Sequence, residues 1–185
     1  EPTAYRRLGD ALKLFSRNIT SIVTHGENLV KRADEIIGNC TSLTVSAFKG
    51  DPDGELQYSV LQEFLAKKGD RPPIVNVKIV GAEPKIDYSS LGVPIIHRVL
   101  HVPEGDFRYV KRDPTVPEVG ICLDFLSHPS IDWQGRLFIC NRLDPDDAGL
   151  LGDLKVDTLY DLWNGDQRRS WLVAHMAGRR DLASP

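Results

Sequence analysis

Hydrophobic and polar residues along residues 1–101 follow two alternating patterns, one typical of helices and one typical of strands. Some stretches place apolar residues at helical spacing, and others are short runs rich in β-branched residues. The predicted helices cover residues 4–16, 28–37 and 57–68, and the predicted strands cover residues 19–24, 42–47, 74–80 and 94–100. This alternation indicates βαβ units with right-handed connections and a parallel sheet. The sequence therefore predicts an α/β fold, open or partly closed into an incomplete barrel, with ligands at the carboxyl ends of the strands.

The pattern changes after residue 101. Residues 102–118 are rich in charges and contain three prolines, which break regular structure, and we therefore predict a linker there. Residues 119–185 are predicted to form a second, smaller domain made of a β-hairpin and a helix. The hairpin turns at residues 132–135, and the helix runs from Thr158 to about Met176, with Gly165 as the residue at which it could divide.

Two cysteines, Cys122 and Cys140, lie on either side of the predicted hairpin turn. A thiol on each arm could point toward one site, and thiolates are soft ligands that select iron–sulfur clusters, zinc or copper. Two other interpretations remain open: a pair of small buried hydrophobic side chains, or a disulfide across the hairpin. The third cysteine, Cys40, ends a predicted helix and is interpreted as a packed core thiol.

Composition narrows the class of protein. The 185 residues are 41% hydrophobic and 26% charged, which is ordinary for a soluble globular protein, and the net charge of -3 gives no general attraction to nucleic acid or to an anionic membrane. No apolar run approaches the roughly 20 residues that span a bilayer, and no signal peptide is visible. An odd number of cysteines argues against a secreted disulfide framework, so we expect a cytoplasmic protein.

The cysteine pair and its surroundings resemble the start of the SPASM or twitch domain found at the C-terminus of many radical S-adenosylmethionine enzymes. That domain begins with a cysteine, a spacer of nine to fifteen residues, a glycine, four residues and a second cysteine. Here twelve residues separate Cys122 from Gly135, and four separate Gly135 from Cys140. The later Leu162-Trp163 pair is similar to one in the family's following helix. The resemblance implies that both thiolates are ligands of an auxiliary [4Fe–4S] cluster.

The first domain also resembles this family, at three short motifs. Glu1-Pro2 is similar to the end of the Gly-Gly-Glu-Pro motif, Thr24-His25-Gly26 to a Thr-Asn-Gly that ends a barrel strand, and the strand ending in Ser46 to the strand after it. The resemblance implies that Glu1 binds the amino group of S-adenosylmethionine. It also implies that Thr24, His25, Gly26 and Ser46 lie around the same cofactor.

The resemblance implies an enzyme that cleaves S-adenosylmethionine reductively to a 5′-deoxyadenosyl radical, which abstracts hydrogen from a peptide or protein. A small-molecule, flavodoxin-like or ferredoxin-like reductant would supply the electron. The family's Cys-x3-Cys-x2-Cys motif, which holds a second [4Fe–4S] cluster, does not occur in this chain. We expect it upstream of Glu1 and the remaining SPASM cysteines beyond Pro185, so this piece alone is expected to be inactive.

A different class of function remains open beside the radical enzyme. The hairpin cysteines would then hold zinc, or no metal, and the α/β part would be the scaffold of a non-catalytic metal-binding or interaction module. A degenerate radical enzyme retained for substrate binding is a third interpretation. The number and kind of metal ions in the full-length protein would separate the three.

Overall fold

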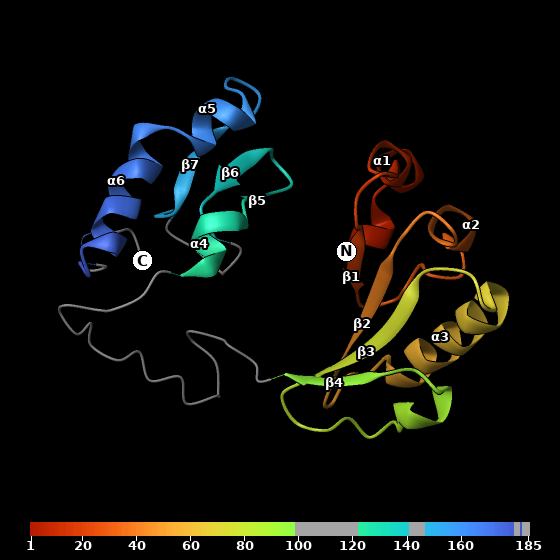
Figure 1. Cartoon of the computed structure of the whole chain (residues 1–185). Coiled ribbons are helices and arrows are strands. Elements are labelled where there is room, and N and C mark those ends of the chain that lie inside the picture. Colours follow the sequence, from red (N-terminus) through yellow and green to blue (C-terminus); the bar gives the residue numbers. More distant parts are fainter. Residues whose placement is uncertain (99–121, 141–146, 180–181, 183–185) are drawn as a thin grey trace. The chain divides into compact units, whose positions relative to one another are not determined.

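The structure is a computed structural model that describes residues 1–98, 122–140, 147–179 and 182. The chain divides into two compact units, Glu1–Tyr109 and Val110–Pro185, each with its own sheet (Figure 1). Each unit also has its own hydrophobic core. The predicted linker at 102–118 lies outside the described residues. Among the helices of the described residues, none is long and apolar enough to cross a membrane.

Unit 1 is built on a parallel sheet, as the alternating pattern predicted. Its strands are β1 (Ser21–Thr24), β2 (Ser42–Phe48), β3 (Ile74–Val80) and β4 (Ile95–Arg98). They lie in the order β1-β2-β3-β4, with each strand hydrogen-bonded to the next along the chain (Figure 1). Because all four run in one direction, their carboxyl ends share one edge, where Thr24 lies opposite Val45.

Helical segments precede or connect these strands, and two of them are shorter than the sequence predicted. They are η1 (Pro2–Ala4), α1 (Leu8–Leu14), α2 (Ala33–Ile36), α3 (Gly54–Lys68) and η2 (Tyr88–Leu91). The predicted helix at 28–37 is regular only in α2 and is preceded by turns. Leu29, Ala33 and Ile36 are nevertheless all fully buried. The turns and α2 thus place these apolar residues on one buried side, and their spacing in the sequence is that of a helix.

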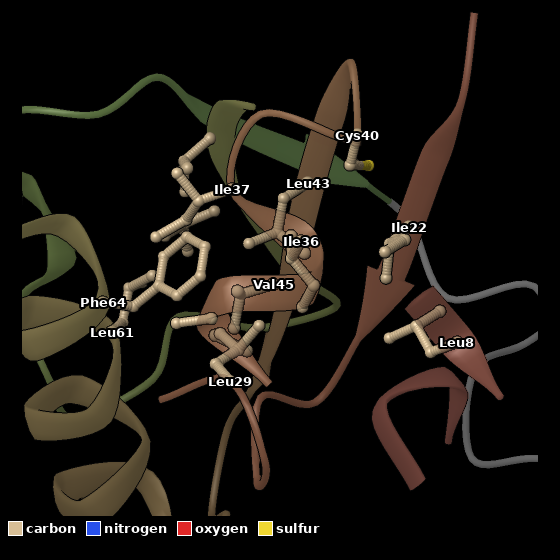
Figure 2. Packing of buried hydrophobic residues seen from close by; sticks show 14 of the residues in the cluster. Leu8, Ile22, Leu29, Ile36, Ile37, Cys40, Leu43, Val45, Leu61 and Phe64 are labelled. Carbon is tan, nitrogen blue, oxygen red and sulfur yellow. The ribbon is translucent and has the colours of Figure 1, made fainter. Parts of the chain in front are cut away.

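The core of unit 1 lies between the sheet and its helices. Alternate residues of β2 and β3 point into it, including Leu43, Val45 and Val77, which have no exposed surface. Leu61 and Phe64 extend from α3 into this cluster (Figure 2). Cys40 is 3% exposed within the same cluster, which confirms that it is a packed core thiol. Such burial stabilises the unit by about 1.5–3 kcal/mol for each large apolar side chain.

The described residues of unit 2 form a three-stranded antiparallel sheet and three short helices. The helices are α4 (Leu123–Ser127), α5 (Leu159–Trp163) and α6 (Asp166–Met176), and the strands are β5 (Ser130–Ile131), β6 (Arg136–Phe138) and β7 (Leu150–Asp153), in the order β5-β6-β7. Gly165 caps α6 and divides the predicted helix at 158–176 into α5 and α6.

The hairpin turn is confirmed, but its first arm is shorter than predicted. The amide of Gly135 donates to the carbonyl of Asp132 at 3.1 Å, and Gly135 adopts a φ of 86° that favours glycine. The first arm is only β5, because Pro129 precedes it and has no N–H for a sheet. Cys122 therefore does not lie on a hairpin arm: it precedes the helix α4.

A buried arginine explains why α4 forms a helical turn instead of a strand. Arg168 of α6 donates to the carbonyls of Phe125 and Leu126, which lie at the end of α4, at 3.4 and 3.1 Å. Its guanidinium also stacks over the ring of Trp163, 3.8 Å from the centroid. Phe125 packs in a core with Leu137, Ile139 and Leu151. These contacts between distant segments outweigh the local strand pattern around Cys122.

Candidate functional site

Glu1 lies against the carboxyl end of β1, where the short helix η1 packs beside that strand. Its Oε1 accepts hydrogen bonds from the hydroxyl groups of Thr24 and Thr3 and from the amide of Thr3. Its Oε2 accepts one hydrogen bond, from the amide of His25 at 3.0 Å. The structure thus joins the first residue of the chain to the Thr24-His25-Gly26 segment that the sequence singled out.

These contacts keep the Glu1 carboxyl group ionised. Partial burial acts to raise its pKa, but the hydrogen bonds from Thr24, Thr3 and His25 together outweigh that effect and lower the pKa to about 2. A carboxylate has about four positions that accept hydrogen bonds. Among the described residues three donors converge on Oε1 and one on Oε2, so Oε2 retains the capacity to accept a donor from a ligand.

Gly26 gives the loop after β1 its shape. Its φ of 106° is rarely adopted by residues with a side chain, and its amide donates to Thr24 Oγ1 at 3.0 Å. Thr24 is 3% exposed and donates its hydroxyl hydrogen to Glu1. Because the same hydroxyl accepts from Gly26 and donates to Glu1, its orientation is fixed.

The structure adds Gln57 to this group, a residue that the sequence pattern alone did not single out. Gln57 is on α3 and is 4% exposed, and its Nε2 lies 2.5 Å from the carbonyl oxygen of His25 and 3.1 Å from that of Ser46. It therefore connects the segment after β1 with β2. A signal was present: Gln57 is a polar residue on the helix face that buries Leu61 and Phe64.

Two further residues, Asp51 and Tyr88, complete the polar cluster. His25 Nε2 lies 3.3 Å from Asp51 Oδ2, and Tyr88 donates its hydroxyl hydrogen to Gln57 Oε1 at 2.6 Å. Burial raises the pKa of Tyr88 to about 12, with smaller contributions from the negative charges of Asp51 and Glu55. Tyr88 is therefore protonated at neutral pH and acts as a donor.

All five residues predicted to lie around a cofactor thus meet at one edge of the sheet. Glu1, Thr24, His25 and Gly26 are connected by direct hydrogen bonds, and Ser46 joins them through Gln57. Ser46 is 8% exposed, and its contact with Gln57 is made by its carbonyl group. We call Glu1, Thr24, His25, Gly26, Ser46, Asp51, Gln57 and Tyr88 the rim cluster.

A cavity of about 280 Å³ opens beside the rim cluster, between the His25–Glu27 segment and the first turns of α3. Its wall is partly apolar, from Leu56 and Val60, and partly polar, from His25 and Gln57. A larger cavity of about 430 Å³ lies at the opposite edge, where Thr20, Thr41 and Ile74 begin the strands. The rim cluster does not border the larger cavity, so we place the candidate site at the smaller one.

The predicted metal ligands of unit 2 do not complete a metal site. Cys122 is exposed, whereas Cys140 is half-buried and packs against the apolar cluster that contains Leu137. Within the described ranges of the chain there is no group of three or more His, Cys, Asp or Glu residues that could hold a metal ion. A [4Fe–4S] cluster and a structural zinc ion both need four ligands as a rule, so the described residues fit neither group. The structure joins none of the three cysteines in a disulfide.

Comparisons with known proteins do not assign this arrangement to a family. No family model, curated protein or solved structure matches the chain. Function must therefore be inferred from the rim cluster itself and from the motifs in the sequence.

Proposed function

We propose that unit 1 is part of a radical S-adenosylmethionine enzyme and that Glu1 binds the ammonium group of the S-adenosylmethionine methionyl moiety. The observation that carries this proposal is the Glu1 carboxylate, which is ionised and held by Thr24 and His25 with a remaining acceptor position on Oε2. An ammonium group is the natural partner of such a carboxylate, because hydrogen bonds between charged groups are stronger than those between neutral ones.

The position of the cluster supports the same proposal. In parallel α/β sheets, ligands bind outside the carboxyl ends of the strands, which is where the rim cluster lies. Four parallel strands that alternate with helices are also consistent with a partial (β/α) barrel of the radical S-adenosylmethionine type. The resemblance of Glu1-Pro2 and Thr24-His25-Gly26 to the family's motifs adds an independent reason from the sequence.

In the proposed enzyme, S-adenosylmethionine supplies a 5′-deoxyadenosyl radical for hydrogen abstraction from a peptide or protein. The residues of the rim cluster bind and orient the cofactor. Glu1 fixes its ammonium end, and Thr24 and His25 keep the Glu1 carboxylate in place. The thiols of Cys122 and Cys140 remain proposed ligands of an auxiliary cluster, and we assign no step to them because the described residues do not complete that site.

Binding of S-adenosylmethionine to this chain tests the proposal. Calorimetry should detect binding to the wild-type chain, and Glu1→Gln should weaken it by about tenfold to a hundredfold, because a hydrogen bond to a charged group is lost. Glu63→Gln is the matched control, since Glu63 is an exposed residue of α3 outside the rim cluster. We expect that variant to bind like the wild type.

A second ligand identifies which group Glu1 binds. 5′-Deoxy-5′-methylthioadenosine has the nucleoside but lacks the methionyl ammonium group, so its affinity should be equal for the wild type and Glu1→Gln. The proposal is wrong if the wild-type chain does not bind S-adenosylmethionine. It is also wrong if Glu1→Gln weakens both ligands equally.

A further inference from the structure

Gln57 bridges three segments of the chain at the carboxyl edge of the sheet. Its Nε2 group lies within hydrogen-bond distance of the His25 carbonyl at 2.5 Å, of His25 Nδ1 at 3.0 Å and of the Ser46 carbonyl at 3.1 Å. Its Oε1 accepts from Tyr88 at 2.6 Å. One side chain thus connects β2, η2 and the residue that follows β1.

These partners allow only one orientation of the Gln57 amide. The carbonyls of His25 and Ser46 are acceptors and need the NH₂ group, whereas the Tyr88 hydroxyl is a donor and needs the oxygen. Exchanging the amide oxygen and nitrogen would place oxygen against two carbonyl oxygens. One Nε2 hydrogen therefore points toward His25 and the other toward the Ser46 carbonyl in the folded chain.

The fixed amide in turn selects one tautomer of His25. Nε2 has two hydrogens for three neighbouring acceptors, so His25 Nδ1 shares one of them with the His25 carbonyl. Because the amide nitrogen offers no lone pair to a ring N–H, Nδ1 faces a donor and carries no hydrogen. The ring proton then resides on Nε2, which lies 3.3 Å from Asp51 Oδ2. The ring is thus placed between an amide donor on one side and a carboxylate on the other.

We infer that Gln57 is a positioning residue of the Glu1 site, which acts by holding the His25 peptide and ring in a single arrangement. This inference deepens the proposed function and depends on it for the identity of the ligand. The His25 carbonyl is bound by Gln57, and the His25 amide donates to Glu1 Oε2 at 3.0 Å. Both ends of the residue are therefore constrained, and a change at Gln57 is transmitted to Glu1 although the two side chains share no hydrogen bond.

The first test measures the His25 tautomer. Long-range ¹⁵N NMR of the imidazole ring should show hydrogen on Nε2 and none on Nδ1 in the wild-type chain. Gln57→Glu replaces the donor group by a carboxylate, so His25 Nδ1 should gain a proton in this variant. Gln62→Glu introduces the same change at an exposed position of the same helix and should leave the His25 signals in place.

The second test follows the carboxyl group of Glu1 without any ligand. Gln57→Met removes the hydrogen bonds while it adds no charge, and Tyr88→Phe removes only the donor to Gln57 Oε1. If His25 is loosened, its amide binds Glu1 less well and the carboxylate loses stabilisation. The ¹³C titration midpoint of Glu1 should then rise by about one pH unit in Gln57→Met, which is a tenfold change in the ionisation constant. The rise should be smaller in Tyr88→Phe, which keeps the test valid if Gln57→Met fails to fold.

The results separate this inference from the proposed function. A wild-type His25 protonated on Nδ1 would overturn the inference, as would an unchanged Glu1 midpoint in both folded variants. Failure of the wild-type chain to bind S-adenosylmethionine would overturn the proposed function only, because neither NMR measurement uses the cofactor. Where the cofactor binds, Gln57→Met should weaken its affinity about tenfold relative to Gln62→Glu.

Discussion

The rim cluster of unit 1 and the cysteine pair of unit 2 differ in how well the sequence predicted where their residues lie. Five residues of the rim cluster were singled out from the sequence. Glu1 was indicated by the family resemblance alone, whereas the Thr24–Gly26 segment and Ser46 were indicated both by that resemblance and by topology, since parallel strands bring their carboxyl ends to one edge. All five meet at that edge. The cysteines were placed by assuming that strand structure continues from the hairpin turn back to Cys122, and it does not. Positions that follow from topology survive small errors in element boundaries, whereas positions that follow from extrapolation along the chain do not.

The largest expected effect comes from disrupting the two cores separately. Phe64→Ala in unit 1 and Leu137→Ala in unit 2 each remove a side chain with no exposed surface, at a cost of about 3–5 and 2–5 kcal/mol respectively. Hydrogen exchange read by mass spectrometry should show faster exchange in β1–β3 for the first variant and in β6–β7 for the second.

Tryptophan fluorescence provides an independent measurement for the same pair of variants. All three tryptophans, Trp133, Trp163 and Trp171, belong to unit 2. Leu137→Ala should therefore lower the denaturant midpoint seen by fluorescence, and Phe64→Ala should leave it unchanged. If each variant changed hydrogen exchange in both units and the fluorescence midpoint to the same extent, the two units would unfold together and the comparison between them would fail.

A smaller effect is expected from acid at Glu1. Its pKa falls from an ordinary 4.5 to about 2 on folding, so the ionised form stabilises the folded chain. This stabilisation is complete above about pH 4.5 and is lost as the pH falls through about 2. Because the Glu1 side chain is largely exposed, we expect about 1 kcal/mol and not the full value of the shift.

Urea unfolding from pH 6 to pH 2 checks this prediction. The wild type should be more stable than Glu1→Gln at pH 6, and the difference should disappear near pH 2. Glu63→Gln is the matched control, because Glu63 is an exposed residue of α3 outside the rim cluster. A difference between wild type and Glu1→Gln that grew toward low pH would show that Glu1 is not stabilised as the carboxylate.

The smallest expected effect is that of thiol alkylation, which tests the exposure of the cysteines and not the free energy of unfolding of the chain. Cys122 is exposed, Cys140 is half-buried, and Cys40 is buried with a pKa raised mainly by desolvation. Iodoacetamide reacts with accessible thiolates, so the native chain should be modified at Cys122 first, Cys140 second and Cys40 last. Peptide mass spectrometry after short exposures gives this order directly. Modification of Cys140 before Cys122 would contradict the burial of Cys140 against the unit 2 core.

The fold of unit 1 was predictable because its signals are local and repeated. The β-branched runs at 42–47 and 74–80 coincide with β2 and β3 to within a residue. Helix α3 begins at Gly54, three residues earlier than predicted. Its first residues belong to a Gly- and Asp-rich segment for which the sequence predicts a loop. Parallel pairing then followed from the alternation of strands with helices.

The missed features depend on contacts between residues far apart in the chain. The helical spacing shows that Gln57 is a polar residue on the buried face of α3, but it does not show that the carbonyls of His25 and Ser46 are its partners. The helical turn of α4 depends on Arg168, which lies more than forty residues away in the sequence. No spacing rule within one segment contains this information, because the partner that decides the structure lies in another segment.

The strand order of unit 1 has a consequence for how the chain is made. Since β1, β2, β3 and β4 occur in space in the same order as in the sequence, β2, β3 and β4 each find a partner strand already synthesised when they leave the ribosome. Among these four described strands, none is inserted between two that were made before it. Unit 1 can therefore assemble vectorially, and a nascent chain that has emerged from the ribosome as far as Val80 can form a three-stranded sheet that already carries the rim residues Glu1, Thr24 and Gln57.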